Sequence, residues 1–283
     1  MHVGQFATNP PVTRAPGVEP GARLREYASA ELAHAIDCLG WRGPRMHTGV
    51  HQARKSLRRT RATFALAMPA LGPGAGLIDG ELRRINRSLS KLRDTHALVT
   101  ALNQMIEKAT DDPVTLSVLR RARRIAVRKR TACARKTLAA DPLLQDKRAL
   151  LDVLHAGLSA LKWKAIGASD AATALQRSAT DARNAAAKAR ASHDDEDWHQ
   201  WRRRARRLSQ QQRAIGDASA NQALDKHDKR LAILLGQAQD HALLIEHCGR
   251  KSLFAQVDRL ALRALATNRL QRLRERLMKL AAE

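Results

Sequence analysis

Two segments of the chain repeat one pattern of histidine and basic residues. VHQARKSLRRTR, which begins at Val50, returns as WHQWRRRARRLS, which begins at Trp198. His51 aligns with His199, and the cations that follow align one by one at an offset of 148 residues. Imidazole and guanidinium groups donate hydrogen bonds to phosphate and carboxylate oxygens. The repeated segment therefore indicates an anion-binding surface that the chain carries twice.

On a helix, each segment separates into a packing face and a basic face. At about 100° per residue, one arc of the first segment holds His51, Arg54, Arg58 and Arg61. Apolar residues fill the neighbouring arc, and Lys55 and Arg59 flank the basic arc. The second segment has the same layout, with a basic arc formed by His199, Arg202 and Arg206. One face of each helix can thus pack while the other presents a cationic stripe.

Like charges at helical spacing repel each other by some tenths of a kcal/mol per pair. A charge run is often only a solvated face, but a stripe that is duplicated position by position favours an anionic partner. Arginine dominates both stripes, which suits bidentate bonding to phosphate or carboxylate. A third basic run carries arginines on one arc, namely Arg120, Arg124, Arg128 and Arg135.

A second pair of segments indicates that a whole helical unit is duplicated. LSKLRDTHAL from Leu89 returns as LGQAQDHALL from Leu235, which aligns Asp94 with Asp240 at an offset of 146 residues. Two blocks in the same order predict a pseudo-two-fold molecule whose repeats face each other. We expect a first repeat at about 23–143, a connecting helix at about 144–166 and a second repeat at about 167–283.

Composition favours an all-α fold for these repeats. Hydrophobic residues make up 44% of the chain but aromatic residues only 3%, so the apolar content is mostly aliphatic. No segment alternates at period two, which predicts no sheet. We expect residues 1–22 to be a disordered Pro-rich tail, followed by helices near 23–39, 46–69, 78–108, 114–139, 144–163, 171–192, 195–214, 221–247 and 250–281.

Charge and cysteine content limit which cellular compartment and which binding partners are plausible. The 51 lysines and arginines outnumber the 27 aspartates and glutamates, giving a formal net charge of +24. No apolar stretch is long enough to predict a membrane span, so we expect a soluble, cytoplasmic protein. Three isolated cysteines predict neither a disulfide framework nor a cysteine zinc site. His47 and His51 have a spacing that zinc uses, but no acidic residue accompanies them, so we expect no metal or cofactor.

The order of the motifs resembles a known family. H-x-x-R-[KR]-x-x-R-R followed by L-x-x-x-R-D, in a basic helical chain, is similar to the CHAD family, the conserved histidine α-helical domain, from about residue 23 onward. The resemblance implies two four-helix-bundle-like halves around a central basic pore or cavity. It also implies binding of inorganic polyphosphate and an association with polyphosphate granules. Because the motif helices carry almost no carboxylates to hold metal ions, we expect this binding to be non-catalytic.

The resemblance assigns ligand-facing roles residue by residue. The set that it implies is His51, Arg54, Lys55, Arg58, Arg59, Arg61, His199, Arg202, Arg203, Arg206 and Arg207. Arg93 and Asp94 match the R-D element, and we add Arg120, Arg124 and Arg128 from the third run. The second repeat departs from the pattern at Gln239, which puts a ligand role for that segment in doubt.

The acidic residues admit two interpretations. Asp94 and Asp240 could hold a phosphate-bound metal, but a lone carboxylate among cations is better suited to orient an arginine of its own repeat. The acidic run at 194–197 precedes the second motif segment, where carboxylates cap a helix and favour its positive end.

Two alternatives to polyphosphate binding remain open. A chain this basic would attract nucleic acid non-specifically, although it has few aromatic residues on which bases could stack. A polyphosphate-processing enzyme is the other alternative, with His51 or His199 as phosphoryl acceptor, but the motif helices carry almost none of the carboxylates that phosphoryl transfer needs. If the two histidines bind phosphate, we expect binding to tighten between pH 8 and pH 6.

Overall fold

The computed structural model describes residues 19–109, 112–192, 194–218 and 226–280. This part of the chain contains ten α-helices and three short 3₁₀-helices and no strand, which confirms the all-α prediction. The α-helices are α1 (Pro20–Leu39), α2 (Met46–Leu71), α3 (Pro73–Ser88), α4 (Ser90–Glu107), α5 (Pro113–Ala140), α6 (Gln145–Ser159), α7 (Ala168–Ser192), α8 (Asp195–Ala218), α9 (Lys226–His247) and α10 (Gln256–Leu280). Residues 1–18 of the expected tail lie outside the described residues, while 20–22 already belong to α1.

The prediction of a single helix over 78–108 is wrong, because the structure divides this region into α3 and α4. Leu89 is fully buried at the junction, and the Ser88 hydroxyl donates to the carbonyl of Ile85 at 2.8 Å. The preceding break is also narrower than expected. Gly72 alone separates α2 from α3, with a φ of 80° that favours glycine, and Pro73 then starts α3.

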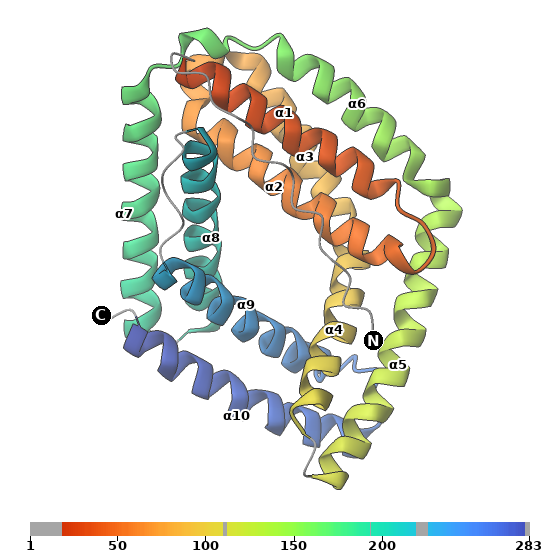
Figure 1. Cartoon of the computed structure of the whole chain (residues 1–283). Coiled ribbons are helices and arrows are strands. Elements are labelled where there is room, and N and C mark those ends of the chain that lie inside the picture. Colours follow the sequence, from red (N-terminus) through yellow and green to blue (C-terminus); the bar gives the residue numbers. More distant parts are fainter. Residues whose placement is uncertain (1–18, 110–111, 193, 219–225, 281–283) are drawn as a thin grey trace.

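The helices pack as antiparallel neighbours and surround an open centre in the cartoon (Figure 1). The principal pairs are α1 with α2, α4 with α5, α7 with α8, and α9 with α10. One helix of each pair lies on the inner side, and the inner helices contact one another in a closed cycle of α2, α4, α9 and α8. Helix α6 packs outside α1 and α3.

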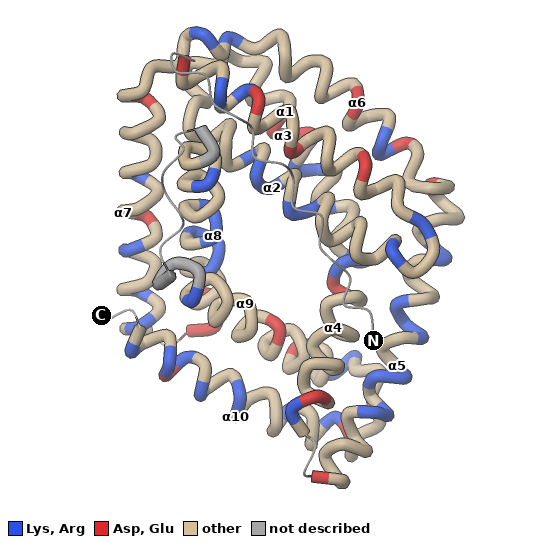
Figure 2. Tube along the Cα trace, in the orientation of Figure 1, with Lys and Arg blue, Asp and Glu red and all other residues tan. Residues whose placement is uncertain are grey.

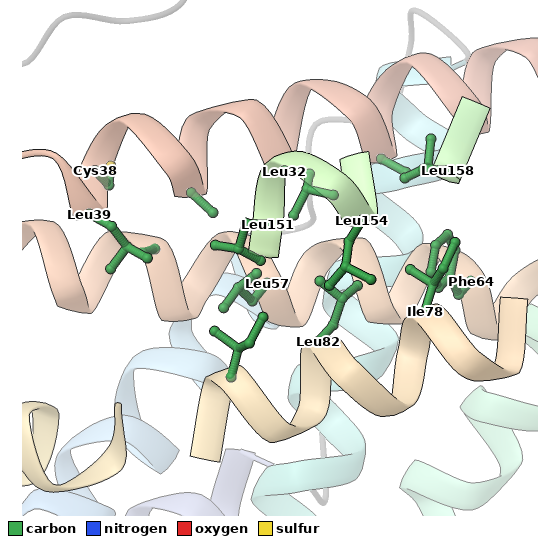
Figure 3. Close-up of a cluster of buried hydrophobic side chains, with 14 of the residues drawn as sticks. Leu32, Cys38, Leu39, Leu57, Phe64, Ile78, Leu82, Leu151, Leu154 and Leu158 are labelled. Carbon is green, nitrogen blue, oxygen red and sulfur yellow. The ribbon is translucent and has the colours of Figure 1, made fainter. Parts of the chain in front are cut away.

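Apolar packing follows this ring of helices in three clusters. The first joins α1, α2, α3 and α6, and Figure 3 shows Leu32, Leu57, Leu82 and Leu154 converging there. The second draws on α4, α5, α9 and α10, and the third on α7 to α10. Helices α2 and α8 border the centre of the ring, and Figure 2 shows basic positions along both helices. The pseudo-two-fold relation and a central pore stay predictions.

Candidate anion-binding site

Arg58 on α2 lies among four other arginines that come from three helices. Burial, followed by the charges of Arg206, Arg54, Arg93 and Arg202 in that order, lowers its pKa to about 8. A guanidinium ordinarily stays protonated at any physiological pH, so this shift reports a cation that is poorly solvated and also surrounded by like charges. We call these five residues the arginine cluster. It joins α2 and α4 of the first repeat to α8 of the second.

The other members of the arginine cluster from α2 and α8 also have lowered pKa values. Burial is the main cause that lowers the pKa of Arg54, Arg202 and Arg206 to about 10, and neighbouring arginines add to it. All three side chains are half-buried, so water still reaches them. The Nε atoms of Arg54 and Arg58 are buried and lack a hydrogen-bond partner within the described residues. The arginine cluster therefore offers unused donors to an anion that enters from solvent.

Arg54 also fixes the corner between α3 and α4. Its Nη1 donates to Ser90 Oγ at 3.0 Å and to the carbonyl of Asn86. Asn86 lies in the last turn of α3, where carbonyls lack helical partners and attract cations. Arg54, a member of the arginine cluster, thus also links the two helix ends at the unexpected break between α3 and α4.

Two aspartates border the arginine cluster. Asp94 accepts a hydrogen bond from Arg93 at 2.9 Å, which agrees with the prediction that it orients an arginine of its own repeat. Burial raises the pKa of Asp240, while Arg93 and Arg202 act in the opposite direction. Asp240 therefore lies close to an arginine of each repeat. It also lines a cavity of about 170 Å³ between α4, α9 and α10.

The two histidines of the repeated motif differ in their surroundings. Burial, followed by the charges of Arg58, Arg93, Lys55 and His96, lowers the pKa of His51 to about 4. The water-accessible ring of His51 is therefore neutral in the unliganded protein between pH 6 and pH 8. This corrects the expectation that His51 gains charge in that range.

His199 has a fixed partner. Its Nδ1 donates to Oε1 of Gln239 at 2.9 Å. Gln239 is the residue that departs from the R-D pattern, so the departure supplies an amide that orients the histidine of the second repeat.

Several residues of the expected ligand-facing set have carboxylate partners. Arg59 donates to Glu31 at 2.6 Å. Arg61 donates to both oxygens of Asp79, at 2.8 and 3.1 Å. These two arginines join α2 to α1 and α3, respectively, and are less available to a ligand.

Other expected site residues lie at the edge of the arginine cluster or away from it. Lys55 is half-buried near Arg58, and Arg203 and Arg207 are exposed. On α5, the buried residues are Leu119, Ala122 and Ala126, which follow the packed face. The three arginines of that helix that we expected to bind ligand are exposed on the opposite face, and these are Arg120, Arg124 and Arg128. The structure does not bring these three together with the arginine cluster.

Sequence reasoning missed Arg130, a half-buried arginine of α5 that lies near His47 on α2 and His96 on α4. Burial is the main cause that lowers its pKa, and its charge in turn lowers the pKa of His47 and His96. Arg130 lies seven residues after Arg123, at the edge of the packed face. Placing this run on a helical wheel, with its alanines on the packed face, could have distinguished Arg130 from its exposed neighbours.

Metal-ligating groups also gather on α1, outside the motif. His34, Asp37 and Cys38 place ligand atoms within 4.8 Å of one another. Burial raises the pKa of the Cys38 thiol to about 11, with Asp37 contributing in the same direction. A metal needs the thiolate, so this cluster is a poor metal site.

The acidic run before α8 behaves as predicted for a helix cap. Asp194 accepts a hydrogen bond from the backbone N–H of Glu196 at 3.1 Å. Asp197 is buried and pairs with Lys188 at 2.9 Å.

A family model described as the CHAD domain matches residues 26–249. The chain belongs to the CHAD domain family. The CHAD chain is also similar to the solved structure of PptA from Streptomyces chartreusis, with a TM-score of 0.66 and 17% sequence identity over 94% of this chain and 100% of that one. At this identity the likeness shows a shared fold. No curated protein matches this CHAD chain. Within its described residues, no helix is both long and apolar enough to span a bilayer.

Proposed function

We propose that this CHAD chain binds inorganic polyphosphate and does so without catalysis. The observation that carries the proposal is the position of Arg58 among Arg54, Arg93, Arg202 and Arg206. Five cations from three helices create a local excess of positive charge that one small anion would only partly relieve. A linear chain with a negative charge on every phosphate can contact several of them at once.

The pairing of the two repeats supports a shared binding surface. Arg58 and Arg206 occupy equivalent positions of the repeated motif, and so do Arg54 and Arg202. We infer that the space bordered by α2, α4, α8 and α9 is the central basic pore that the family resemblance implies. On this proposal the protein acts in the cytoplasm and associates with polyphosphate granules through the polymer that it binds.

The acids near the arginine cluster favour binding over catalysis. Phosphoryl transfer uses carboxylates to hold metal ions against the phosphates. Asp94 is paired with Arg93, and burial keeps the pKa of Asp240 raised between two arginines. Incubation with polyphosphate and Mg²⁺, followed by chain-length analysis, tests this part of the proposal. Shortened chains would identify a polyphosphate-processing enzyme instead.

A competition experiment tests the choice of ligand. Labelled long-chain polyphosphate is bound to the CHAD chain at physiological salt and displaced with polyphosphate, single-stranded DNA or double-stranded DNA at matched phosphate concentration. We expect unlabelled polyphosphate to displace the label at a much lower concentration than either nucleic acid. Equal or better displacement by nucleic acid would show that the site is a general basic surface.

A further inference from the structure

A second group of nitrogen-bearing side chains, two histidines and one arginine, lies where α2, α4 and α5 meet. The rings of His47 on α2 and His96 on α4 are stacked, with centroids 5.4 Å apart and an angle of 12° between their planes. Arg130 on α5 is the charged group that lowers the pKa of either histidine most, after burial. None of these three residues belongs to the repeated motif or to the arginine cluster.

Each member of this group has a hydrogen-bonding nitrogen without a partner. The buried atoms are Nδ1 of His47, Nδ1 of His96 and Nε of Arg130, considering the residues that the structure describes. Unsatisfied buried polar atoms are costly, so native structures retain few of them without a reason. The guanidinium of Arg130 donates in any case, and each histidine can donate through Nδ1 in the tautomer that carries the proton there, which is what a phosphate oxygen needs.

The equivalent place in the second repeat is arranged differently. Asp195 stands at the position of His47, and Ala242 stands at the position of His96. Asp195 accepts a hydrogen bond from Arg274 of α10, and the guanidinium of Arg274 lies 5.1 Å from the centroid of the Trp198 ring. The second repeat therefore neutralises its arginine with a carboxylate of its own, whereas histidine takes the place of that carboxylate in the first repeat.

The histidine pair is continuous with the arginine cluster. Arg93 of the arginine cluster lowers the pKa of His96, and His96 lowers that of His51. Arg93 and His96 therefore connect the arginine cluster to Arg130, with the arginines supplying the charge and His96 a polar ring between them.

We propose that His47, His96 and Arg130 form a second phosphate subsite, which continues the arginine cluster toward α5 and exists only in the first repeat. The inference rests on the proposed function and deepens it, because it gives a bound polyphosphate chain one favoured direction of exit. Beyond the arginine cluster, the bound polyphosphate runs along the first repeat and not along the second.

The test compares two lengths of the same ligand. Inorganic tripolyphosphate can be held by the arginine cluster alone, while long-chain polyphosphate also reaches the second subsite. In the double variant His47→Asn with Arg130→Met, we expect long-chain affinity to fall by about tenfold and tripolyphosphate affinity to stay within about twofold. Arg128→Met is the matched control, because it removes one exposed arginine from the same helix.

The outcomes separate this inference from the proposed function. If the wild-type CHAD chain binds neither ligand, the proposed function fails. If it binds both, and the double variant behaves like Arg128→Met or loses both lengths equally, the second subsite does not exist.

A gain-of-function variant covers the case in which the double variant does not fold. Asp195→Asn releases Arg274 from its carboxylate and should strengthen long-chain binding by a few-fold while leaving tripolyphosphate affinity unchanged. Asp181→Asn is its control, because Asp181 pairs at 2.8 Å with Arg204, an exposed arginine of α8 outside the arginine cluster. Unchanged long-chain affinity in Asp195→Asn, or an equal gain in Asp181→Asn, would contradict the subsite.

Discussion

Arg206 on α8 is the neighbouring charge that lowers the pKa of Arg58 on α2 most strongly. The two residues occupy the same position of the repeated motif, 148 residues apart. Equivalent arginines of the two repeats therefore lie close together instead of pointing into separate regions of solvent. Like charges in a partly desolvated place destabilise the unliganded protein, and an anion between them removes that cost.

Neutralising Arg58 should change stability and binding in opposite directions. Arg58→Gln removes one cation from the arginine cluster, so we expect the unliganded protein to melt about 2 °C or more higher. The same change should weaken polyphosphate binding by about tenfold or more. Thermal unfolding and fluorescence anisotropy measure the two effects. Arg128→Gln, on the exposed face of α5, should alter neither, and a destabilised Arg58→Gln protein would argue against repulsion in the arginine cluster.

Neutralising Asp240 should produce the reverse pattern. Asp240→Asn removes a negative charge that lies near Arg93 and Arg202. We expect the unliganded protein to become less stable, because the arginines lose a counter-charge, and polyphosphate to bind a few-fold more tightly. Weaker binding in this variant would indicate that the carboxylate contributes to the ligand site, as a metal-holding residue would.

Acidification should destabilise the unliganded protein. The pKa of His51 is about 4 in the folded chain, and that of an unfolded histidine is about 6.5. Between these values the unfolded state binds more protons, so the free energy of unfolding decreases as the pH falls from 6.5 to 4. Urea unfolding at several pH values measures this slope. His51→Asn should reduce it, and an unchanged slope would remove His51 from the titration.

Polyphosphate binding should respond to pH in the same acidic window. The groups that face His51 are Lys55 and Arg58 from α2 and Arg93 and His96 from α4. A bound anion offsets their charge, but burial, the largest cause of the low pKa, persists. We therefore expect affinity to change little between pH 8 and pH 6.5 and to rise below that. Titrations across the range test this, with His51→Asn expected to show a smaller rise.

Salt should weaken binding in proportion to the phosphates that are neutralised. If the rule for single-stranded nucleic acid transfers to polyphosphate, log affinity falls with log salt at a slope of about −0.7 per phosphate contacted. Replacing Arg202 and Arg206 by glutamine should make the slope shallower. Replacing Arg120, Arg124 and Arg128 should leave it nearly unchanged, although the net charge falls further. Equal changes in both variants would indicate diffuse attraction without a site.

Local signals in the sequence predicted many helix ends to within a few residues. Pro113 begins α5, one residue before the expected start, because proline suits the first helical position regardless of tertiary contacts. Gly72 and Pro73 lie inside the expected break before α3, but the break is shorter than expected. The break at Leu89 has no such signal. It depends on burial of the leucine and on Arg54, which contacts both helix ends from α2.

The candidate site was predictable to a similar degree. Helical periodicity was enough to place Arg54 and Arg58 on one face. It could not show that Glu31 and Asp79, from other helices, would pair with Arg59 and Arg61. Arg130 was missed for a related reason, since its partial burial depends on how α5 packs against α4.

The bond from Arg54 to Asn86 and Ser90 bears on how quickly a ligand is captured. This side chain is already held in place before any anion arrives, and its remaining N–H groups can donate to a phosphate without breaking the existing contacts. Binding of the anion then requires no rearrangement of the junction between α3 and α4. The association rate is set by diffusion and by long-range attraction to the basic surface, and differences in affinity among variants should arise mainly in how slowly the polymer departs.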